Sequence, residues 1–138
     1  MQWFLGAKYG MFIHFGLYSQ LGGIYQGNDD GRYAEWIQAN QKIPKSDYIK
    51  LIDSWMPNDF DADKIVSLAK DAGMKYLVVT SKHHEGFCLW DSEFTEYDIA
   101  NSPMQGRDFI QELSDACKKQ NIHFGTYYSI IDWNHPSH

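Results

Sequence analysis

The chain has few of the features that mark disulfide-bonded, membrane or nucleic-acid-binding proteins. It contains only two cysteines, Cys88 and Cys117, and they lack a CxxC spacing, so we expect free thiols and no disulfide framework. No stretch approaches the roughly 18 apolar residues of a membrane span, and the first ten residues lack the basic and apolar regions of a signal peptide. The formal net charge is -6 without any arginine-rich run. We therefore expect neither a membrane nor a nucleic acid as partner, and the compartment stays open.

Aromatic residues, by contrast, are abundant. They make up 16% of the chain, and hydrophobic residues as a whole make up 43%. This composition suggests a thick core or a pocket whose rings stack on flat or partly apolar ligands. A length of 138 residues suffices for one ordinary core, so we treat residues 1–138 as one unit without a second domain.

Buried strands and helices alternate along the chain. Apolar runs at residues 11–15, 75–81 and 122–129 predict strands. Helices are expected at residues 33–40, from a Ser46 N-cap to about Trp55, from Asp61 to a terminating Gly73, and from Gly106 onward. The apolar faces of the last two helices are assigned to Ile65, Leu68, Ala69 and Ala72, and to Phe109, Ile110, Leu113, Ala116 and Cys117.

The order of these elements predicts a parallel α/β sheet. Leu68 and Leu113 are 45 residues apart, and Tyr76 and Ile122 are 46 apart, so two helix–strand units repeat with matching phase. No GxGxxG motif or P-loop follows the first strand, which counts against a nucleotide-binding fold. A complete (β/α)8 barrel needs about 250 residues. We therefore predict an α/β fold that is a partial (β/α)8 TIM-like barrel, with about three parallel strands and intervening helices.

Polar residues gather just after each predicted strand, where a barrel places its active site. His14 follows the first strand and the adjacent pair His83 and His84 follows the second. Neighbours in a strand point to opposite faces. The pair lacks both spacings of a usual metal site, which are i, i+2 on a strand and i, i+4 on a helix. Hydrogen bonding to a polar ligand is therefore favoured over metal ligation. A structural role for one of the rings, and a metal-dependent barrel hydrolase that uses all three histidines, remain alternatives.

Other candidate residues suit carbohydrate chemistry. Glu35 and Trp36 are adjacent, so a carboxylate that accepts sugar hydroxyls lies beside a ring that can stack on a sugar; the alternative is a solvated glutamate beside a packed tryptophan. Glycoside hydrolysis usually needs two facing carboxyl groups, about 5–5.5 Å apart for retention. Nothing in the sequence pairs the acids of the long connection, which we expect to be mostly solvated: Glu85, Asp91, Glu93, Glu96 and Asp98.

Taken in order, four segments resemble the α-L-fucosidases of glycoside hydrolase family 29. They are "KYGMFIHFGLYS", "YAEWI", "FDADKIVSLAKDAGMKYLVVTSKHHEGFCLW" and "IHFGTYYSIIDW". The resemblance runs over almost the whole chain, and its specific parts are "FIHFG" and "KHHEGF". The chain departs from the usual family residues at Phe15, Ile37 and Glu85.

This resemblance implies a retaining hydrolase that removes terminal α-L-fucosyl groups through a covalent fucosyl-enzyme intermediate. Its substrate would be a fucoside or fucosylated glycan, with no metal or other cofactor. The nucleophile and the acid/base of the family lie on later strands, so no catalytic residue is assigned and the isolated chain is expected to be inactive. A non-catalytic sugar-binding half-barrel, or one that self-associates through open sheet edges, is the remaining alternative. The sugar-binding residues that the resemblance implies are His14, Glu35, Trp36, His83, His84 and one tyrosine of "YYS", for which we choose Tyr128 over Tyr127.

Overall fold

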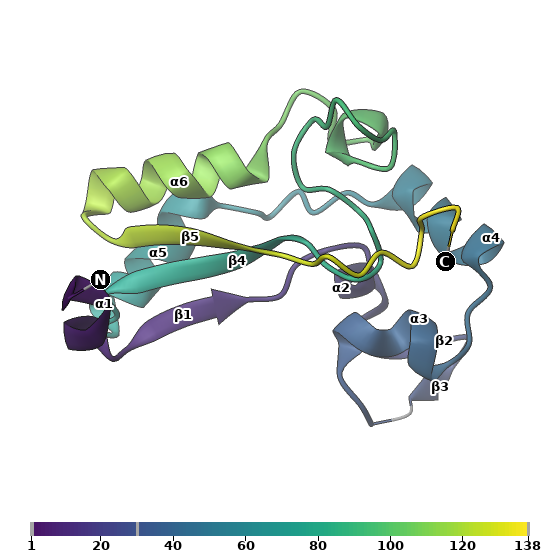
Figure 1. Cartoon of the computed structure of the whole chain (residues 1–138), viewed down its shortest axis with the longest axis horizontal. Helices are drawn as coiled ribbons and strands as arrows, with labels where there is room; N and C mark the ends of the chain where they lie inside the picture. Colours follow the sequence, from purple (N-terminus) through teal and green to yellow (C-terminus); the bar gives the residue numbers. More distant parts are fainter. Residues whose placement is uncertain (1, 30, 138) are drawn as a thin grey trace.

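A three-stranded parallel sheet forms the centre of the computed structural model, which describes residues 2–29 and 31–137 (Figure 1). The central strand β4 (Tyr76–Lys82) lies between β1 (Gly10–Ile13) and β5 (His123–Tyr128). Both neighbours run parallel to β4. The predicted α/β class with three parallel strands is therefore confirmed.

Because β4 has a neighbour on each side, it is the most deeply buried strand. Leu77 and Val79 are fully buried and belong to the main core. The pairing between β4 and β5 shifts register between Thr80 and Lys82. This irregularity changes the phase of the side chains at the carboxyl end of the sheet, where the predicted site residues lie.

Two helices pack against the sheet and against each other: α5 (Ala62–Asp71) and α6 (Phe109–Gln120) (Figure 1). Each begins after an aspartate whose carboxylate accepts a hydrogen bond from a backbone N–H of the first turn, as N-caps do. Asp61 accepts from Lys64 N at 3.0 Å, and Asp108 accepts from Gln111 N at 2.8 Å. Helix α6 begins at Phe109, three residues after the predicted start at Gly106.

The apolar face of α5 differs from the predicted one. Ala62, Val66 and Ala69 are buried, whereas Leu68 is 65% exposed. Leu68 and Val66 are two positions apart, which places them on different sides of a helix. The predicted apolar face of α6 is largely confirmed, since four of its five residues are buried: Phe109, Leu113, Ala116 and Cys117.

Short elements fill the remaining chain. The predicted Ser46-capped helix is instead α4 (Lys45–Tyr48), which follows Pro44 and continues into the 3-10 helix η2 (Ile49–Ser54). The predicted helix at residues 33–40 is η1 (Ala34–Trp36) followed by α3 (Ile37–Asn40). Several short elements were not predicted from the sequence: α1 (Gln2–Ala7), α2 (Tyr18–Leu21), the hairpin of β2 (Ile24–Tyr25) and β3 (Asn28–Asp29), and η3 (Ile99–Asn101). Asp30, which follows β3 in the chain, lies outside the described residues. Among the described helices, none is long and apolar enough to cross a membrane.

Candidate functional site

The carboxyl ends of β1 and β4 bring the three predicted imidazoles together. His14 follows β1, and the pair His83 and His84 follows β4. The ring centroids of His14 and His83 are 5.3 Å apart, and those of His83 and His84 are 4.2 Å apart. Because the two strands are parallel neighbours, side chains that are about 70 residues apart in the chain lie together in one cluster.

A tight turn explains how both members of the pair reach the same cluster. The backbone N–H of Gly86 donates to the carbonyl of His83 at 3.0 Å. Gly86 has φ +88°, and a Cβ at this position would lie 2.4 Å from Oδ1 of Asp132. The histidines therefore lie where the chain leaves the strand, and the alternation of an extended strand does not separate them.

Two tryptophan rings border this cluster. The centroid of Trp36 is 5.0 Å from that of His84, and Trp133 is 5.4 Å from both rings. Trp133 also donates its backbone N–H to the carbonyl of His84 at 2.7 Å. Trp133 was not among the predicted site residues, although its place in the loop after β5 was a usable signal.

Glu35 lies beside Trp36 in η1 and is partly exposed. Burial raises the pKa of the Tyr18 phenol, and the charge of Glu35 makes a small further contribution; the Tyr18 ring centroid is 5.7 Å from that of His83. The predicted carboxylate therefore acts weakly on Tyr18, whose ring borders His83.

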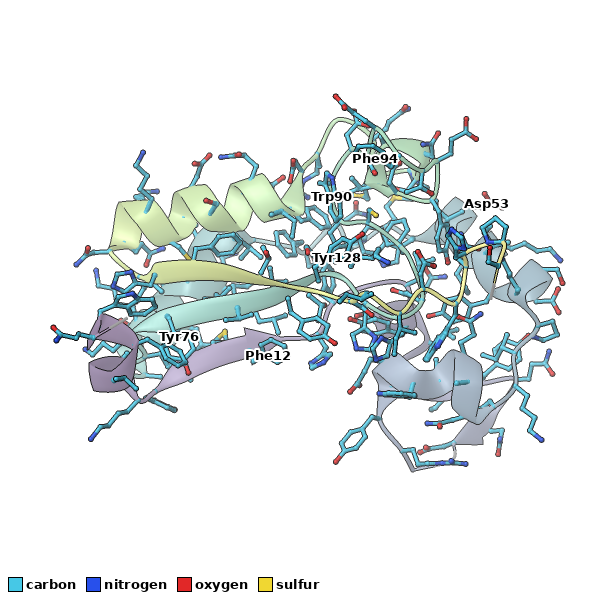
Figure 2. All side chains as sticks on the ribbon, in the orientation of Figure 1. Phe12, Asp53, Tyr76, Trp90, Phe94 and Tyr128 are labelled. Atoms are coloured by element: carbon cyan, nitrogen blue, oxygen red, sulfur yellow. The ribbon has the colours of Figure 1, made fainter. Side chains whose placement is uncertain are left out.

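The two tyrosines at the end of β5 have different neighbours. The Tyr127 ring lies 6.0 Å from His83 and 6.0 Å from Phe12. The Tyr128 ring instead lies under the Lys82 ammonium, at 4.9 Å, and 6.3 Å from Trp90. Figure 2 shows Tyr128 beside Trp90 and away from Phe12. The structure thus places Tyr127, and not the chosen Tyr128, beside the histidines, because strand alternation lets only one of the two face them.

Burial keeps the histidine pair neutral at physiological pH. Desolvation lowers the pKa of His83 to about 4, and the charges of His84 and His14 add to this effect. The pKa of His84 is lowered by desolvation and by the charges of Lys82 and His14. A neutral imidazole has one donor and one acceptor nitrogen, so the cluster can bind hydroxyl groups in both senses.

The loop acids are mostly solvated, as predicted, since Asp91, Glu93 and Glu96 are exposed. Glu85 and Asp98 are the exceptions, at 2% and 1% exposed. Glu85 accepts hydrogen bonds from the backbone N–H of Leu17 at 3.0 Å and from the hydroxyl of Tyr48 at 2.5 Å. Despite these bonds, burial raises the pKa of Glu85 to about 7. Its side chain connects three separate segments of the chain, and a Cβ at Gly16 would lie 2.1 Å from Oε1.

Histidine, cysteine and acidic side chains, the usual metal ligands, are spread over the described residues. Among them, no group of three or more His, Cys, Asp or Glu side chains is arranged to hold a metal ion. Burial raises the pKa of the Cys88 thiol to about 12, so it stays protonated. The nearby Lys82 ammonium, which is 5% exposed, is paired with Asp132 at 3.0 Å.

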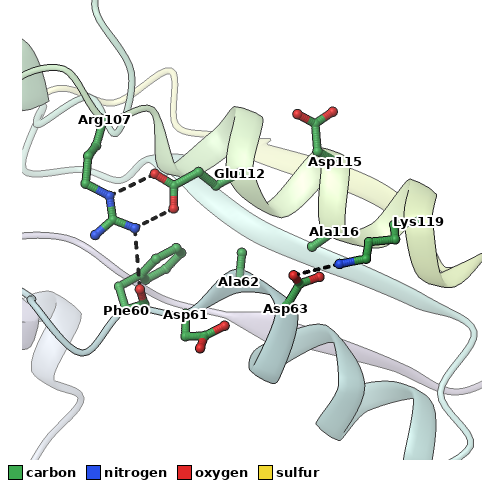
Figure 3. Close-up of a pocket in the computed structure, with 9 residues that line it drawn as sticks. All are labelled: Phe60, Asp61, Ala62, Asp63, Arg107, Glu112, Asp115, Ala116 and Lys119. Atoms are coloured by element: carbon green, nitrogen blue, oxygen red, sulfur yellow. Dashed lines mark hydrogen bonds and ion pairs between the residues drawn. The ribbon is translucent and has the colours of Figure 1, made fainter.

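A cleft of about 540 Å³ lies apart from the histidines, between α5 and α6 (Figure 3). Two ion pairs lie among its charged side chains. Arg107 pairs with Glu112 at 2.5 Å, and Lys119 pairs with Asp63 at 2.9 Å. We interpret this cleft as part of the contact that holds the helices together.

Comparison with known proteins identifies the family. Residues 1–138 match the family described as Alpha-L-fucosidase. The chain belongs to the α-L-fucosidase family. The α-L-fucosidase of Dictyostelium discoideum is 33% identical over 153 residues, a match that covers 97% of this chain and 32% of the relative. The plasma α-L-fucosidase of Homo sapiens is 34% identical over 149 residues, which covers 97% of this chain and 30% of the relative.

Solved α-L-fucosidase structures share the fold closely. The α-L-fucosidase AlfC from Lactobacillus casei, in complex with its α-L-fucose product, superposes with a TM-score of 0.93 at 50% identity; the match covers 98% of this chain and 42% of that one. A family 29 α-L-fucosidase from Bacteroides thetaiotaomicron superposes with a TM-score of 0.95 at 43% identity, covering 100% of this chain and 31% of that one. The chain thus spans about a third of the length of the curated relatives.

Proposed function

We propose that the chain forms the fucose-contacting part of a retaining α-L-fucosidase. The observation that carries this proposal is the cluster of three imidazoles bordered by Trp36, with ring centroids 4.2 to 5.3 Å apart. Family membership supports it, since the Lactobacillus casei relative is described in complex with α-L-fucose. In this proposal residues 1–138 are the N-terminal part of a catalytic (β/α) barrel.

The residue types suit a deoxyhexose. Each sugar hydroxyl both donates and accepts, as does each neutral imidazole. The rings of Trp36 and Trp133 offer apolar surface for the methyl group and for the less polar face of the sugar. A sugar that lacks one of the contacted hydroxyls leaves a polar group of the site unpaired, which provides discrimination. Because the Tyr127 ring lies 6.0 Å from His83, we assign the tyrosine of this pocket to Tyr127.

The bond-breaking carboxylates are assigned to positions outside residues 1–138. A retaining glycosidase needs a carboxylate that is free to attack the sugar. Both oxygens of Glu85, which follows the pair, already accept hydrogen bonds from the protein, and the side chain is buried. We therefore propose that this chain binds fucose without cleaving fucosides.

Calorimetric titration of the purified chain with L-fucose tests the binding. We expect saturable binding that the Trp36→Ala variant weakens about fivefold or more, because one aromatic contact of this kind contributes about 1 kcal/mol. Trp3→Ala is the matched control, since Trp3 is 49% exposed and stacks on His123. Equal losses in both variants, or no binding by the unmodified chain, would contradict the proposal.

Hydrolysis of 4-nitrophenyl α-L-fucopyranoside tests the second part. We expect the chain to release no more nitrophenol than buffer does. Turnover above this background that a His83→Gln substitution abolishes would show that residues 1–138 contain the catalytic groups, and would overturn this assignment.

We also propose that the isolated chain self-associates. The sheet order β1-β4-β5 leaves one edge of β1 and one of β5 unpaired within the described residues. Phe12 and Tyr127, which are 50% and 37% exposed, lie beside His14 and His83 respectively. Open strand edges and exposed apolar surface favour association. Light scattering should give a mass above 16.0 kDa, and a stable monomer over a wide range of concentrations would refute this.

A further inference from the structure

Ser129 connects the histidine pair to the loop after β5. It is 3% exposed, and its backbone N–H donates to the carbonyl of Lys82 at 2.9 Å, which fixes it beside the end of β4. Its hydroxyl oxygen lies 2.6 Å from Nδ1 of His84 and 2.7 Å from the carbonyl oxygen of Ile131. The side chain therefore makes two short hydrogen bonds in a buried place.

The position of the protons follows from counting donors. A serine hydroxyl has one proton, and a carbonyl oxygen can only accept. The Ser129 proton is therefore used in the bond to Ile131, and the hydroxyl oxygen must accept in the bond to His84. It follows that Nδ1 of His84 carries a proton.

A second proton on the same ring is opposed by its surroundings. Burial lowers the pKa of His84, and the charges of the Lys82 ammonium and of His14 add to this effect. The ring is then neutral, with its proton on Nδ1 and a lone pair on Nε2. Within the described residues, the hydrogen bond of the His84 ring is the one at Nδ1, and no bond to Nε2 is found.

We propose that Ser129 is a positioning residue that fixes the tautomer of His84, so that His84 offers an acceptor nitrogen to the sugar. The identity of the sugar rests on the proposed function, whereas the tautomer does not. The consequence is that the hydroxyl at this position must donate to His84. A sugar whose hydroxyl there is methylated would leave the Nε2 lone pair unpaired and would bind poorly.

Nitrogen NMR of the ligand-free chain, labelled with 15N-histidine, tests the tautomer directly. Correlations through two and three bonds to the ring protons distinguish the two nitrogens, and the ring is assigned from its own backbone amide. At neutral pH we expect the shift of a protonated nitrogen for Nδ1 of His84 and that of an unprotonated nitrogen for Nε2. The reverse pattern, or two protonated nitrogens, would overturn the proposal. This result is independent of fucose binding, so a chain that shows the expected tautomer but binds no fucose would refute only the proposed function.

Variants test the role of the hydroxyl. We expect Ser129→Ala to shift His84 toward the tautomer protonated on Nε2 and to weaken L-fucose binding about three- to tenfold, the range of one hydrogen bond. Ser129→Thr, which keeps the hydroxyl, should retain the original tautomer. The matched control is Ser102→Ala: Ser102 is also buried, donates to a carbonyl and accepts from a backbone N–H, but lies away from the histidines. An unchanged His84 spectrum in Ser129→Ala would overturn the role of Ser129, and the spectrum of the unsubstituted chain decides the tautomer even if a variant fails to fold.

Discussion

Replacing Glu85 by glutamine should make the stability of the chain respond to pH in a defined way. Glu85 is fully buried, and its pKa is raised from 4.5 to about 7 by desolvation, although hydrogen bonds from Tyr48 and the Leu17 backbone act in the opposite direction. Glutamine has nearly the same shape, can accept from Leu17 N–H through its oxygen, and carries no charge at any pH. The variant therefore removes the titration and keeps most of the packing.

The sign and size of the effect follow from linkage. Between pH 4.5 and 7 the unfolded chain releases the Glu85 proton while the folded chain keeps it, so rising pH favours unfolding. The accumulated loss is about 3 kcal/mol, since each pKa unit corresponds to about 1.4 kcal/mol. His83 acts in the opposite direction. Its pKa is lowered from 6.5 to about 4, so folding becomes more favourable as the pH rises from 4 to 6.5. The two contributions nearly cancel in the unsubstituted chain, so only the difference between variants reveals Glu85.

The assay is urea unfolding, followed by tryptophan fluorescence, at several pH values from 4.5 to 7.5. We expect the free energy of unfolding of Glu85→Gln, relative to the unsubstituted chain, to increase by about 3 kcal/mol over this range. Glu93→Gln, at an exposed position of the same connection, is the matched control for replacing a carboxylate by an amide. A difference between Glu85→Gln and the unsubstituted chain that stays constant with pH would refute the reasoning.

Three further predictions concern other residues of the site. Gly16→Ala should lower the free energy of unfolding by about 1–3 kcal/mol in thermal denaturation, because its Cβ would lie 2.1 Å from the buried carboxylate oxygen. Gly6→Ala, where nothing lies within 4 Å, should not, and equal losses would contradict the steric argument. His83 should become protonated only near pH 4 in a proton NMR titration, and a midpoint above pH 6 would contradict its burial. Tyr127→Ala should weaken L-fucose binding about fivefold while Tyr128→Ala does not; the opposite order would restore the choice made from the sequence.

The sequence contained enough information for the sheet and its main helices. Apolar runs with turn residues at both ends gave the three strands, and Asp61 marked the start of α5 correctly. The side of α5 that is buried was harder to predict. Its apolar residues form more than one possible stripe, and only the position of the sheet selects Val66 over Leu68. The short hairpin of β2 and β3 has too few residues to show a period.

The site was predictable in part. His14, His83 and His84 could be grouped because parallel strands end at one edge of a sheet. Which of Tyr127 and Tyr128 faces the histidines depends on a register shift between Thr80 and Lys82. This shift is a property of the pairing between strands, so no pattern in the local sequence reveals it. Glu85 was missed for a related reason, since its hydrogen-bond partners come from distant segments of the chain.

Histidine NMR during an L-fucose titration tests most directly whether one sugar meets all three imidazoles. The account predicts that the ring signals of His14, His83 and His84 change together and saturate with a single dissociation constant. His123, which stacks on Trp3, and the exposed His135 should stay constant and serve as internal controls. Unchanged signals from the three clustered rings, or shifts of equal size in the two control rings, would contradict the account.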